Sequence, residues 1–276
     1  DYGFERAFAS VDDLLAGAHV DALVMVMPIP QIIPMADRLL DNSIPLLIEK
    51  PLGTTLAEAE AFTRRVEDRR CAVMVSLNRR FQPGTRLAVE WLRQQGPVRY
   101  VHGAMLRDGR AEKDFVWGTG IHLLDLMCYL AGPLEAVRSD IVTVPGPAGN
   151  ARVARLRGPA GCKACAEILP CCGRIEEKVR LAGDDWCLDL WTEFAHPWRV
   201  EAYRNSRLEV SQTAQRDCPS DVRNGTYGET EAFLDAVRLG RTLPPPAPSD
   251  VLHACRLTAM LQQSQTSAED LPGGPL

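Results

Sequence analysis

Lys50 is the first side chain whose type and position suggest chemistry. It follows a short apolar run at 46–48 and stands between Glu49 and Pro51. In an open α/β sheet, ligands bind just beyond the carboxyl ends of the strands, and Lys50 would lie at such an end. Its ammonium group could there donate a hydrogen bond to a substrate hydroxyl or lower a neighbour's pKa by its charge. The alternative is an ordinary surface lysine in a loop.

His122 is the second such side chain, on a helix predicted over 118–131. Gly118, His122, Asp125 and Tyr129 are spaced i, i+4, i+7 and i+11, so they share one stripe of that helix. An imidazole in a polar stripe of an otherwise apolar helix suits acid–base chemistry. Spacing alone leaves a packed or solvated histidine as the alternative. We predict that this helix and the Lys50 segment face each other across a cleft.

Three apolar runs position Lys50 in the first part of the chain. They cover residues 21–27, 45–48 and 71–75. Continuous apolar runs are typical of strands that are buried on both faces of a parallel sheet. Helical patterns separate the runs, so residues 1–77 read as β-α-β-α-β. That order predicts an α/β fold with right-handed crossovers.

The pattern changes after residue 78. Short segments of strand character follow one another over 134–213, and several alternate apolar with polar residues. Such alternation is typical of an antiparallel sheet with one covered face. Two helices, over 226–240 and 249–264, are predicted to close the chain. We therefore expect an α+β domain over 78–266 and a disordered tail over 267–276.

Composition excludes several classes of partner. The net charge of −5 over 276 residues argues against a nucleic-acid partner, which favours a concentrated basic patch. No apolar run approaches the ~20 residues that span a bilayer. The nine cysteines are an odd number in a large chain, which favours a reducing compartment over a disulfide framework. The expected location is cytoplasmic.

Four of the cysteines raise the question of a zinc site. They are Cys162, Cys165 and the adjacent pair Cys171-Cys172. No histidine is near them in the sequence and no second well-spaced pair follows, so we predict no metal site. The alternative reading, small apolar residues in adjacent strands and their turn, is favoured.

With these residues in view, the chain resembles the glucose–fructose oxidoreductase/inositol dehydrogenase/MocA (Gfo/Idh/MocA) family of nicotinamide-dependent oxidoreductases. The resemblance runs from Asp12 to about Gln265, and its pieces occur in the family's order. They are Val20-Asp21-Ala22-Leu23-Val24 with Met27-Pro28, Glu49-Lys50-Pro51, Asn78-Arg79-Arg80-Phe81-Gln82-Pro83, Gly120-Ile121-His122-Leu123-Leu124-Asp125, Leu130-Ala131-Gly132, and Glu229 to Leu243.

The resemblance implies a partial Rossmann-type domain over 1–77 that binds NAD or NADP, and an open-faced, mostly antiparallel sheet domain that covers the nicotinamide. It implies hydride transfer at a carbinol carbon of a sugar, cyclitol or related hydroxy compound. By resemblance, His122 accepts the hydroxyl proton and Lys50 hydrogen-bonds the same oxygen. It also implies a homo-oligomer that associates through the open sheet face.

The resemblance assigns the remaining contacts residue by residue. The expected cofactor contacts are Met27, Pro28, Glu49, Lys50 and Arg80. The expected substrate contacts are Arg80, Trp117, His122 and Asp125. Arg107, Arg110 and Lys113 precede the His122 helix, which suits an anionic or hydroxyl-rich substrate, although charges solvated on a loop explain them equally well.

Three polar positions of the family pattern are changed in this chain. The threonine before the first-domain proline is Met27, and the histidine four residues after that proline is Ile32. The aspartate four residues before the catalytic histidine is Gly118. These changes favour a second hypothesis, a non-catalytic relative that senses a ligand or binds a partner protein. Intact Lys50 and His122 favour the enzyme.

The family's glycine-rich turn is not found in these 276 residues. No G-x-G-x-x-G occurs, because Gly118-Thr119-Gly120 lacks the third glycine. The segment before Lys50 is too short for that turn, its helix and the next strand, so we expect the first βαβ unit to lie upstream of Asp1.

We therefore predict that residues 1–276 by themselves bind NADH very weakly, because the phosphates have no cradle of backbone N–H groups. Isothermal titration calorimetry measures this directly. A dissociation constant in the micromolar range would contradict the prediction.

Overall fold

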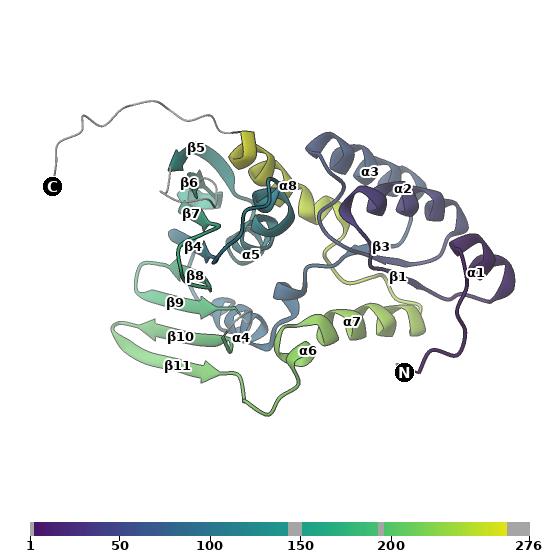
Figure 1. Ribbon diagram of the computed structural model, residues 1–276. Helices are drawn as coiled ribbons and strands as arrows, with labels where there is room; N and C mark the ends of the chain where they lie inside the picture. The colour runs from purple at the N-terminus through teal and green to yellow at the C-terminus, as the bar shows by residue number, and fades with distance from the viewer. Residues whose placement is uncertain (1–2, 143–150, 193–195, 264–276) are drawn as a thin grey trace.

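A three-stranded parallel sheet forms the first part of the computed structural model, which describes residues 3–142, 151–192 and 196–263 (Figure 1). Its strands are β1 (Leu23–Met25), β2 (Leu46–Ile48) and β3 (Val73–Val75), in that spatial order. Leu47 of the central strand pairs with Val24 on one side and Met74 on the other. All of β2 and β3 is buried. The predicted Rossmann-type parallel sheet is confirmed.

Helices cover both faces of this sheet. Figure 1 shows α2 (Ile29–Leu39) and α3 (Leu56–Arg69) on one side and α7 (Thr226–Arg238) on the other, with α1 (Val11–Gly17) at the edge. On the α7 side, Phe233 packs against Leu47 and Met74. A helix from late in the chain therefore completes the core of the first sheet.

Side-chain caps begin two of these helices where the sequence places them. The Thr55 hydroxyl accepts a hydrogen bond from the Glu58 backbone N–H at 3.2 Å, and Ser10 does the same for Asp13 at 3.1 Å. Each cap satisfies a backbone donor that the first helical turn leaves without a partner. The 3₁₀ turn η1 (Leu40–Asn42) then ends α2 ahead of β2.

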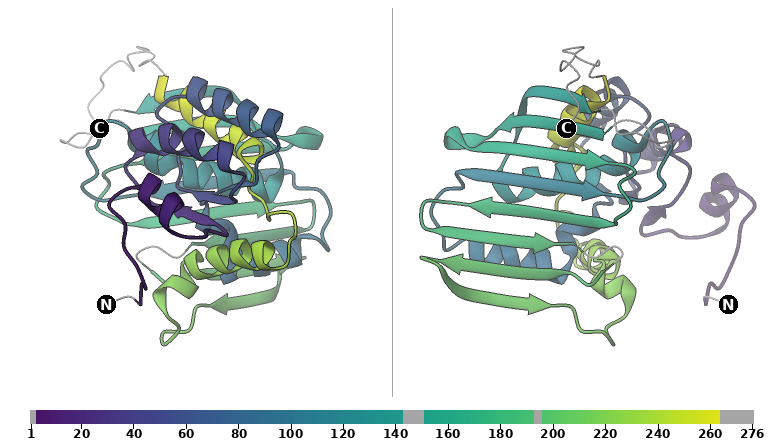
Figure 2. Two further views of the ribbon diagram at one scale, coloured as in Figure 1. Left: turned by 90° about the vertical axis from the view of Figure 1, so that its right-hand side faces the viewer. Right: turned by 60° about the vertical axis from the view of Figure 1, so that its left-hand side comes forward.

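An eight-stranded sheet forms the second part, in the order β11-β10-β9-β8-β4-β7-β6-β5 (Figure 2). Its strands are β4 (Tyr100–Leu106), β5 (Glu135–Val142), β6 (Ala151–Arg157), β7 (Lys163–Leu169), β8 (Glu176–Ala182), β9 (Trp186–Trp191), β10 (Arg199–Arg204) and β11 (Arg207–Thr213). All neighbours are antiparallel except β4 and β7, which run parallel. The predicted mostly antiparallel, open-faced sheet is confirmed.

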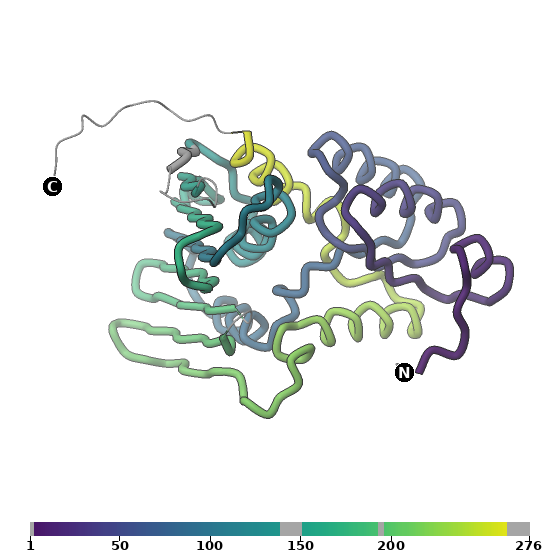
Figure 3. The backbone as a smooth tube through the Cα atoms, viewed as in Figure 1, coloured from purple at the N-terminus to yellow at the C-terminus, as the bar shows by residue number. Residues whose placement is uncertain are grey.

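Helices cover only one face of this large sheet. They are α4 (Pro83–Leu92), α5 (Ile121–Ala131) and α8 (Pro248–Gln263), and Figure 2 (right) shows the strands in front of them. Gly103 of β4 faces α5, because an added Cβ would collide with Met127. The last helix, α8, contacts both α5 and α3 and so joins the two parts of the molecule (Figure 3). No helix in the described ranges is long and apolar enough to cross a membrane.

The structure corrects the helix predicted over 118–131. A π-helical turn, η3 (Val116–Gly120), comes first, and regular helix begins only with α5 at Ile121. A Cβ on Gly120 would approach Ile168 of β7 to 3.0 Å, so this turn lies tightly against the sheet. π-helical turns are rare and are frequently found at functional sites. The predicted tail over 267–276 lies outside the described residues.

Two short elements lie between the sheets and were not predicted as helices. They are the 3₁₀ turn η2 (Asn78–Phe81), directly after β3, and α6 (Ser220–Arg223), directly before α7. Gly225 follows α6 with φ of +88°, and a Cβ there would collide with the backbone of Asn78 and Gln82. A third 3₁₀ turn, η4 (Pro159–Gly161), precedes β7.

We predict that Gly225→Ala lowers the free energy of unfolding by about 3 kcal/mol, because it combines a left-handed backbone with overpacking against η2. The measurement is urea denaturation followed by circular dichroism. Gly240→Ala is the matched control: its φ is +60° but nothing lies within 4 Å of the added Cβ, so its expected cost is only about 1 kcal/mol. Equal costs for the two variants would contradict the close approach.

Candidate active site

Lys50 lies just past the carboxyl end of β2, as predicted. The ladder continues one step beyond the strands, since Glu49 N–H donates to Met25 O at 3.2 Å and Ser76 N–H to Ile48 O at 2.7 Å. The three strands are parallel, so the residues that follow each of them meet at one edge. Lys50 accordingly lines one cavity with Asn78 and Arg79 of the η2 turn.

The Lys50 and His122 segments do face each other. Lys50 Nζ donates a hydrogen bond of 2.7 Å to the carbonyl oxygen of Gly118, in the π-helical turn. Lys50 and His122 line the same cavity, of about 570 Å³. The other lining residues are Asn78, Arg79, Arg110, Thr119, Pro197, Ser220, Arg223 and Asn224. A cavity of this size suits a small molecule.

The His122 imidazole is held in its neutral form. Its Nδ1 is buried and has no hydrogen-bond partner among the residues that the structure describes. Burial lowers the pKa of His122 well below its ordinary value, and the charges of Arg79, Lys50 and Arg107 lower it further. A neutral imidazole has a lone pair that can accept a proton. His122 can therefore act as a base at neutral pH.

The pKa of Lys50 is lowered by the same surroundings. Burial lowers the pKa of Lys50, the neighbouring Glu49 carboxylate opposes that effect, and Arg79 and Arg110 add to it. Burial in turn raises the pKa of Glu49, against the charge of Lys50. The ammonium group nonetheless has a fixed position through Gly118 O, so it can present its other protons to a ligand oxygen.

A buried ionic network supplies the positive charge next to His122. Glu177 of β8 is fully buried and accepts from Arg79 at 2.9 Å, with further bonds from Arg79 and from Arg107. Burial alone would raise the pKa of Glu177, but the two guanidinium groups hold it below its ordinary value. Two cations thus share this carboxylate, and both lower the pKa of His122.

Arg80 and Asp125, both predicted ligand contacts, are paired with each other. The guanidinium of Arg80 donates to both Asp125 oxygens, at 2.8 and 2.6 Å, and both side chains are buried. The same guanidinium lies over the Tyr129 ring, 4.8 Å from its centre. Neither Arg80 nor Asp125 lines the cavity. The residues of the predicted polar stripe therefore have different roles. His122 lines the cavity, whereas Asp125 binds α5 to η2 through Arg80.

Trp117 is buried and its indole N–H donates to Gly53 O at 2.8 Å. This bond ties the π-helical turn to the loop after Lys50. Among the other residues before the helix, Arg110 lines the cavity, Arg107 belongs to the Glu177 network, and Lys113 is exposed away from it. Trp117 thus positions the loop, and it is absent from the cavity lining.

Several cavity residues were missed by the sequence analysis. Ser220, Arg223 and Asn224 come from α6 and the residue after it, and Asn224 O accepts from Asn78 Nδ2 at 2.8 Å. A four-residue helix in a polar segment gives no periodic signal. Arg79 is the neighbour of the predicted Arg80. It lines the cavity while paired with Glu177, a residue that is distant in the sequence, so no local pattern indicates it.

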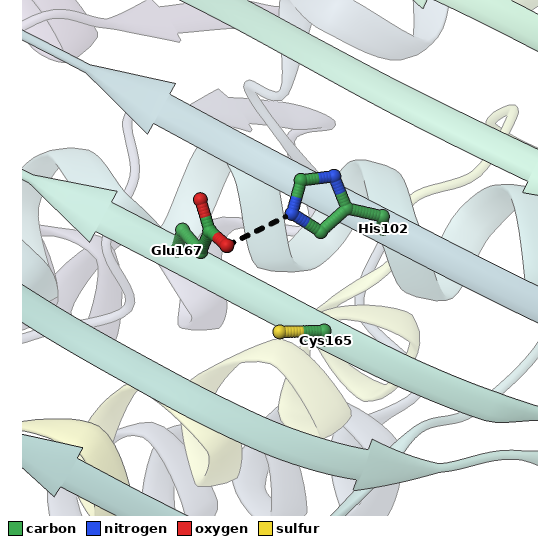
Figure 4. A group of neighbouring side chains, drawn as sticks. All are labelled: His102, Cys165 and Glu167. Atoms are coloured by element: carbon green, nitrogen blue, oxygen red, sulfur yellow. Dashed lines mark ion pairs between the residues drawn. The ribbon is translucent and has the colours of Figure 1, made fainter.

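Among the described residues, no group of metal-ligating side chains contains both members of a cysteine pair. Cys162 is buried before β7 begins, whereas Cys165 lies on the open face of that strand. Strand register instead places His102 directly beside Cys165, with Glu167 two residues along (Figure 4). Their ligand atoms lie within 4.8 Å of one another, and His102 and Glu167 form an ion pair of 3.2 Å. All three are partly exposed, and the expectation of no metal stays a prediction.

We predict that Lys50→Met raises the pKa of His122, because it removes one of the cations that disfavour the imidazolium. Histidine Cε1–H signals followed by NMR against pH measure the shift, with His122→Gln to assign the signal. Arg238→Gln, at an exposed ion pair on α7, is the control and leaves the titration unchanged. An unchanged His122 titration in Lys50→Met would contradict the assignment of charge around the imidazole.

Comparison with known proteins points to one family. Residues 1–77 match the model of an oxidoreductase family with an NAD-binding Rossmann fold. UDP-N-acetylglucosamine 3-dehydrogenase of Acidithiobacillus ferrooxidans is 32% identical over 132 residues, 46% of this chain and 40% of that protein. The dehydrogenase aclE of Aspergillus oryzae is 28% identical over 151 residues, 49% of this chain and 41% of that protein. The matches thus span less than half the length of either relative.

The fold likeness extends over most of the chain. A solved structure of the Acidithiobacillus ferrooxidans enzyme has a TM-score of 0.74 at 24% identity, and covers 93% of this chain and 82% of that chain. The family match, the two relatives and the shared fold agree with the ordered motifs around Lys50 and His122. Residues 1–77 therefore match the Gfo/Idh/MocA oxidoreductase family with its NAD-binding Rossmann fold, and most of the chain has the fold of the solved dehydrogenase structure.

Proposed function

We propose that the protein is an NAD(P)-dependent oxidoreductase that transfers hydride between nicotinamide and a carbinol carbon of a sugar, cyclitol or related hydroxy compound. One observation carries the proposal: a neutral imidazole and a lysine ammonium line one cavity beyond the carboxyl ends of three parallel strands. An alcohol oxidation requires a base for the hydroxyl proton and a donor for the oxygen. His122 and Lys50 supply these two groups.

The surroundings of Lys50 fit a nicotinamide. Its neighbours Met27, Pro28 and Glu49 follow the ends of adjacent parallel strands, which is where open α/β sheets bind ligands. The buried Nδ1 of His122, without a partner among the described residues, is consistent with a ligand in this cavity. A bound nicotinamide would supply the hydride acceptor there. We propose that Met27, Pro28, Glu49 and Lys50 contact it.

The protein's own groups then handle the proton. We propose that the substrate hydroxyl lies between the two side chains, with His122 accepting its proton and Lys50 donating a hydrogen bond to the oxygen. Burial and the cations around His122 keep it neutral before the reaction, which leaves a lone pair available for the proton. The Gly118 carbonyl holds the Lys50 ammonium in place by its hydrogen bond. Arg80, Asp125 and Trp117 act as positioning residues through their buried bonds.

The relatives support a sugar-like substrate. One is named as a dehydrogenase of a nucleotide-linked N-acetyl sugar, and the other as a dehydrogenase. The lining of the cavity is rich in hydrogen-bonding groups, including Asn78, Thr119 and Asn224. Such groups match the hydroxyls of a polyol. A homo-oligomer that associates through the open sheet face is part of the same proposal.

A second function, a non-catalytic ligand sensor or protein-binding regulator, has its own observation. Ile32, at a position where the family has a histidine, is fully buried in the core of the first sheet. Gly118 offers only a carbonyl oxygen to Lys50. A sensor would bind a sugar in the cavity without reducing NAD or NADP. Turnover therefore separates the two functions.

We predict that Lys50→Met and His122→Gln each lower kcat about 10²- to 10⁴-fold, the range for removal of a positioned acid–base group. The measurement is formation of NADH or NADPH with a panel of sugars and cyclitols. His122→Gln should also remove the titration of the base from the pH profile, whereas Lys50→Met should shift that titration upward.

Lys113→Met and His253→Gln are the matched controls, because both side chains are exposed and neither lines the cavity. They should retain the activity of the unaltered protein. Activity in Lys50→Met and His122→Gln that equals that of the controls would refute the assigned roles. Saturable sugar binding with no reduced cofactor would favour the sensor.

A further inference from the structure

The open face of the large sheet carries a second group of side chains that could do chemistry, outside the cavity described above (Figure 4). Gly103 of β4 faces α5. Successive side chains of a strand point to opposite faces, so His102 points away from the helices. Strand register pairs His102 with Cys165 of β7, and Glu167 follows two residues along the same face. Three different metal-binding side chains therefore stand together on this face.

The ligand atoms of this group are close enough to share one metal ion. An imidazole nitrogen, a thiol sulfur and a carboxylate oxygen all lie within 4.8 Å of one another. His102 Nε2 and Glu167 Oε1 are 3.2 Å apart. Zinc binds nitrogen and oxygen at ~2.0–2.2 Å and sulfur at ~2.3 Å, so two ligands of a tetrahedral ion are roughly 3–4 Å apart. The histidine and the glutamate have that separation, and small side-chain movements would bring in the thiol.

The position of the group in the sheet also suits an ion. The side chains of His102 and Glu167 are 31% and 39% exposed, and Cys165 is partly buried. An ion can therefore reach them from solvent. Both strands are internal to the sheet, with β8 beside β4 and β6 beside β7. Ligands on such strands are held more precisely than ligands on loops.

Two arginines flank the group, one on each side. Arg180 of β8 is paired in register with His102, but its guanidinium is directed to Asp189, to which it donates at 2.6 and 2.7 Å. Arg155 of β6 is paired with Cys165 and is exposed, so solvent screens its charge. Coulomb energies fall with distance. A thiolate and a carboxylate in direct contact with a cation therefore outweigh the two guanidinium groups.

The mixture of ligand types favours zinc among the common divalent ions. Zinc takes histidine nitrogen, cysteine thiolate and carboxylate oxygen, whereas magnesium and calcium prefer oxygen ligands alone. Three protein ligands leave the fourth position of a tetrahedral ion for water. The sequence alone gives no sign of this site, because the histidine comes from β4 and is far from Cys165 along the chain.

We infer that His102, Cys165 and Glu167 bind one zinc ion on the open face of the large sheet, with water as the fourth ligand. All three ligands come from one chain, so the expected stoichiometry is one ion per chain in a monomer or in a homo-oligomer. The inference replaces the expectation of no metal, because that expectation considered only residues near the cysteines in the sequence.

Titration with cobalt(II), which replaces zinc and reports its ligands by absorption, tests the inference. The chain is freed of metal with EDTA, kept reduced with a phosphine, and titrated with Co²⁺ and then with Zn²⁺. We expect one Co²⁺ per chain, with the visible bands of four-coordinate cobalt and a near-ultraviolet charge-transfer band from thiolate to cobalt. Zn²⁺ should displace it at about one equivalent, because zinc binds a given site more tightly than cobalt does.

Cys165→Ser should abolish the charge-transfer band. His102→Gln should weaken Zn²⁺ binding at least about tenfold, since even the loss of an outer-shell partner of a metal ligand typically costs ~10–100-fold. Cys187→Ser and His253→Gln are the matched controls. Cys187 is a partly exposed cysteine of β9 and His253 is an exposed histidine of α8, so both variants should bind the ions as the unaltered chain does.

Metal binding that is unchanged in Cys165→Ser and His102→Gln, or that is lost equally in the two controls, would overturn the inference. Absence of saturable binding of Co²⁺ and Zn²⁺ to the unaltered chain would overturn it as well. His102 and Glu167 would then be an ordinary surface ion pair beside a thiol. Hydride transfer has no part in these measurements, so their result does not depend on the proposed function.

Discussion

The buried contact of Glu177 with Arg79 and Arg107 is the interaction on which the rest of the site depends. Its carboxylate comes from the large sheet, and Arg79 comes from the turn that follows the small one. Removing the carboxylate would leave two guanidinium groups buried without compensation, a loss that typically costs ~3–5 kcal/mol. The same contact ties the turn after the small sheet to the large sheet, and its guanidinium groups lower the pKa of His122.

The low pKa of His122 affects both the pH dependence of folding stability and the ability of the imidazole to act as a base. His122 is less basic in the folded chain than in an unfolded one, because it is desolvated and surrounded by cations. Below the ordinary pKa of 6.5, the folded state therefore binds fewer protons at His122 than the unfolded state does. The free energy of unfolding consequently falls as the pH drops below 6.5, whereas above that pH His122 imposes no such loss. The arrangement destabilises the imidazolium. It is favourable for a base that must start the reaction uncharged.

Local sequence signals predicted much of the scaffold. The apolar runs became the buried strands, Ser10 and Thr55 became caps, and Lys50 lies at its strand end, because each of these depends on neighbours in the sequence. The π-helical turn did not follow from any local pattern: it depends on Gly120 packing against Ile168. The α6 wall of the cavity and the His102–Cys165 proximity likewise depend on register and on contacts between distant segments. The pairing of Arg80 with Asp125 shows that a predicted ligand contact can have a structural partner.

The central claim is that Lys50 and His122 serve hydride transfer. The most direct measurement is the transfer of deuterium from a substrate labelled at its carbinol carbon to NAD or NADP, detected by mass spectrometry of the cofactor. The account predicts deuterium in the reduced cofactor of the unaltered protein and its loss in His122→Gln. A substrate that binds in the cavity but delivers no deuterium, with either cofactor, would contradict it.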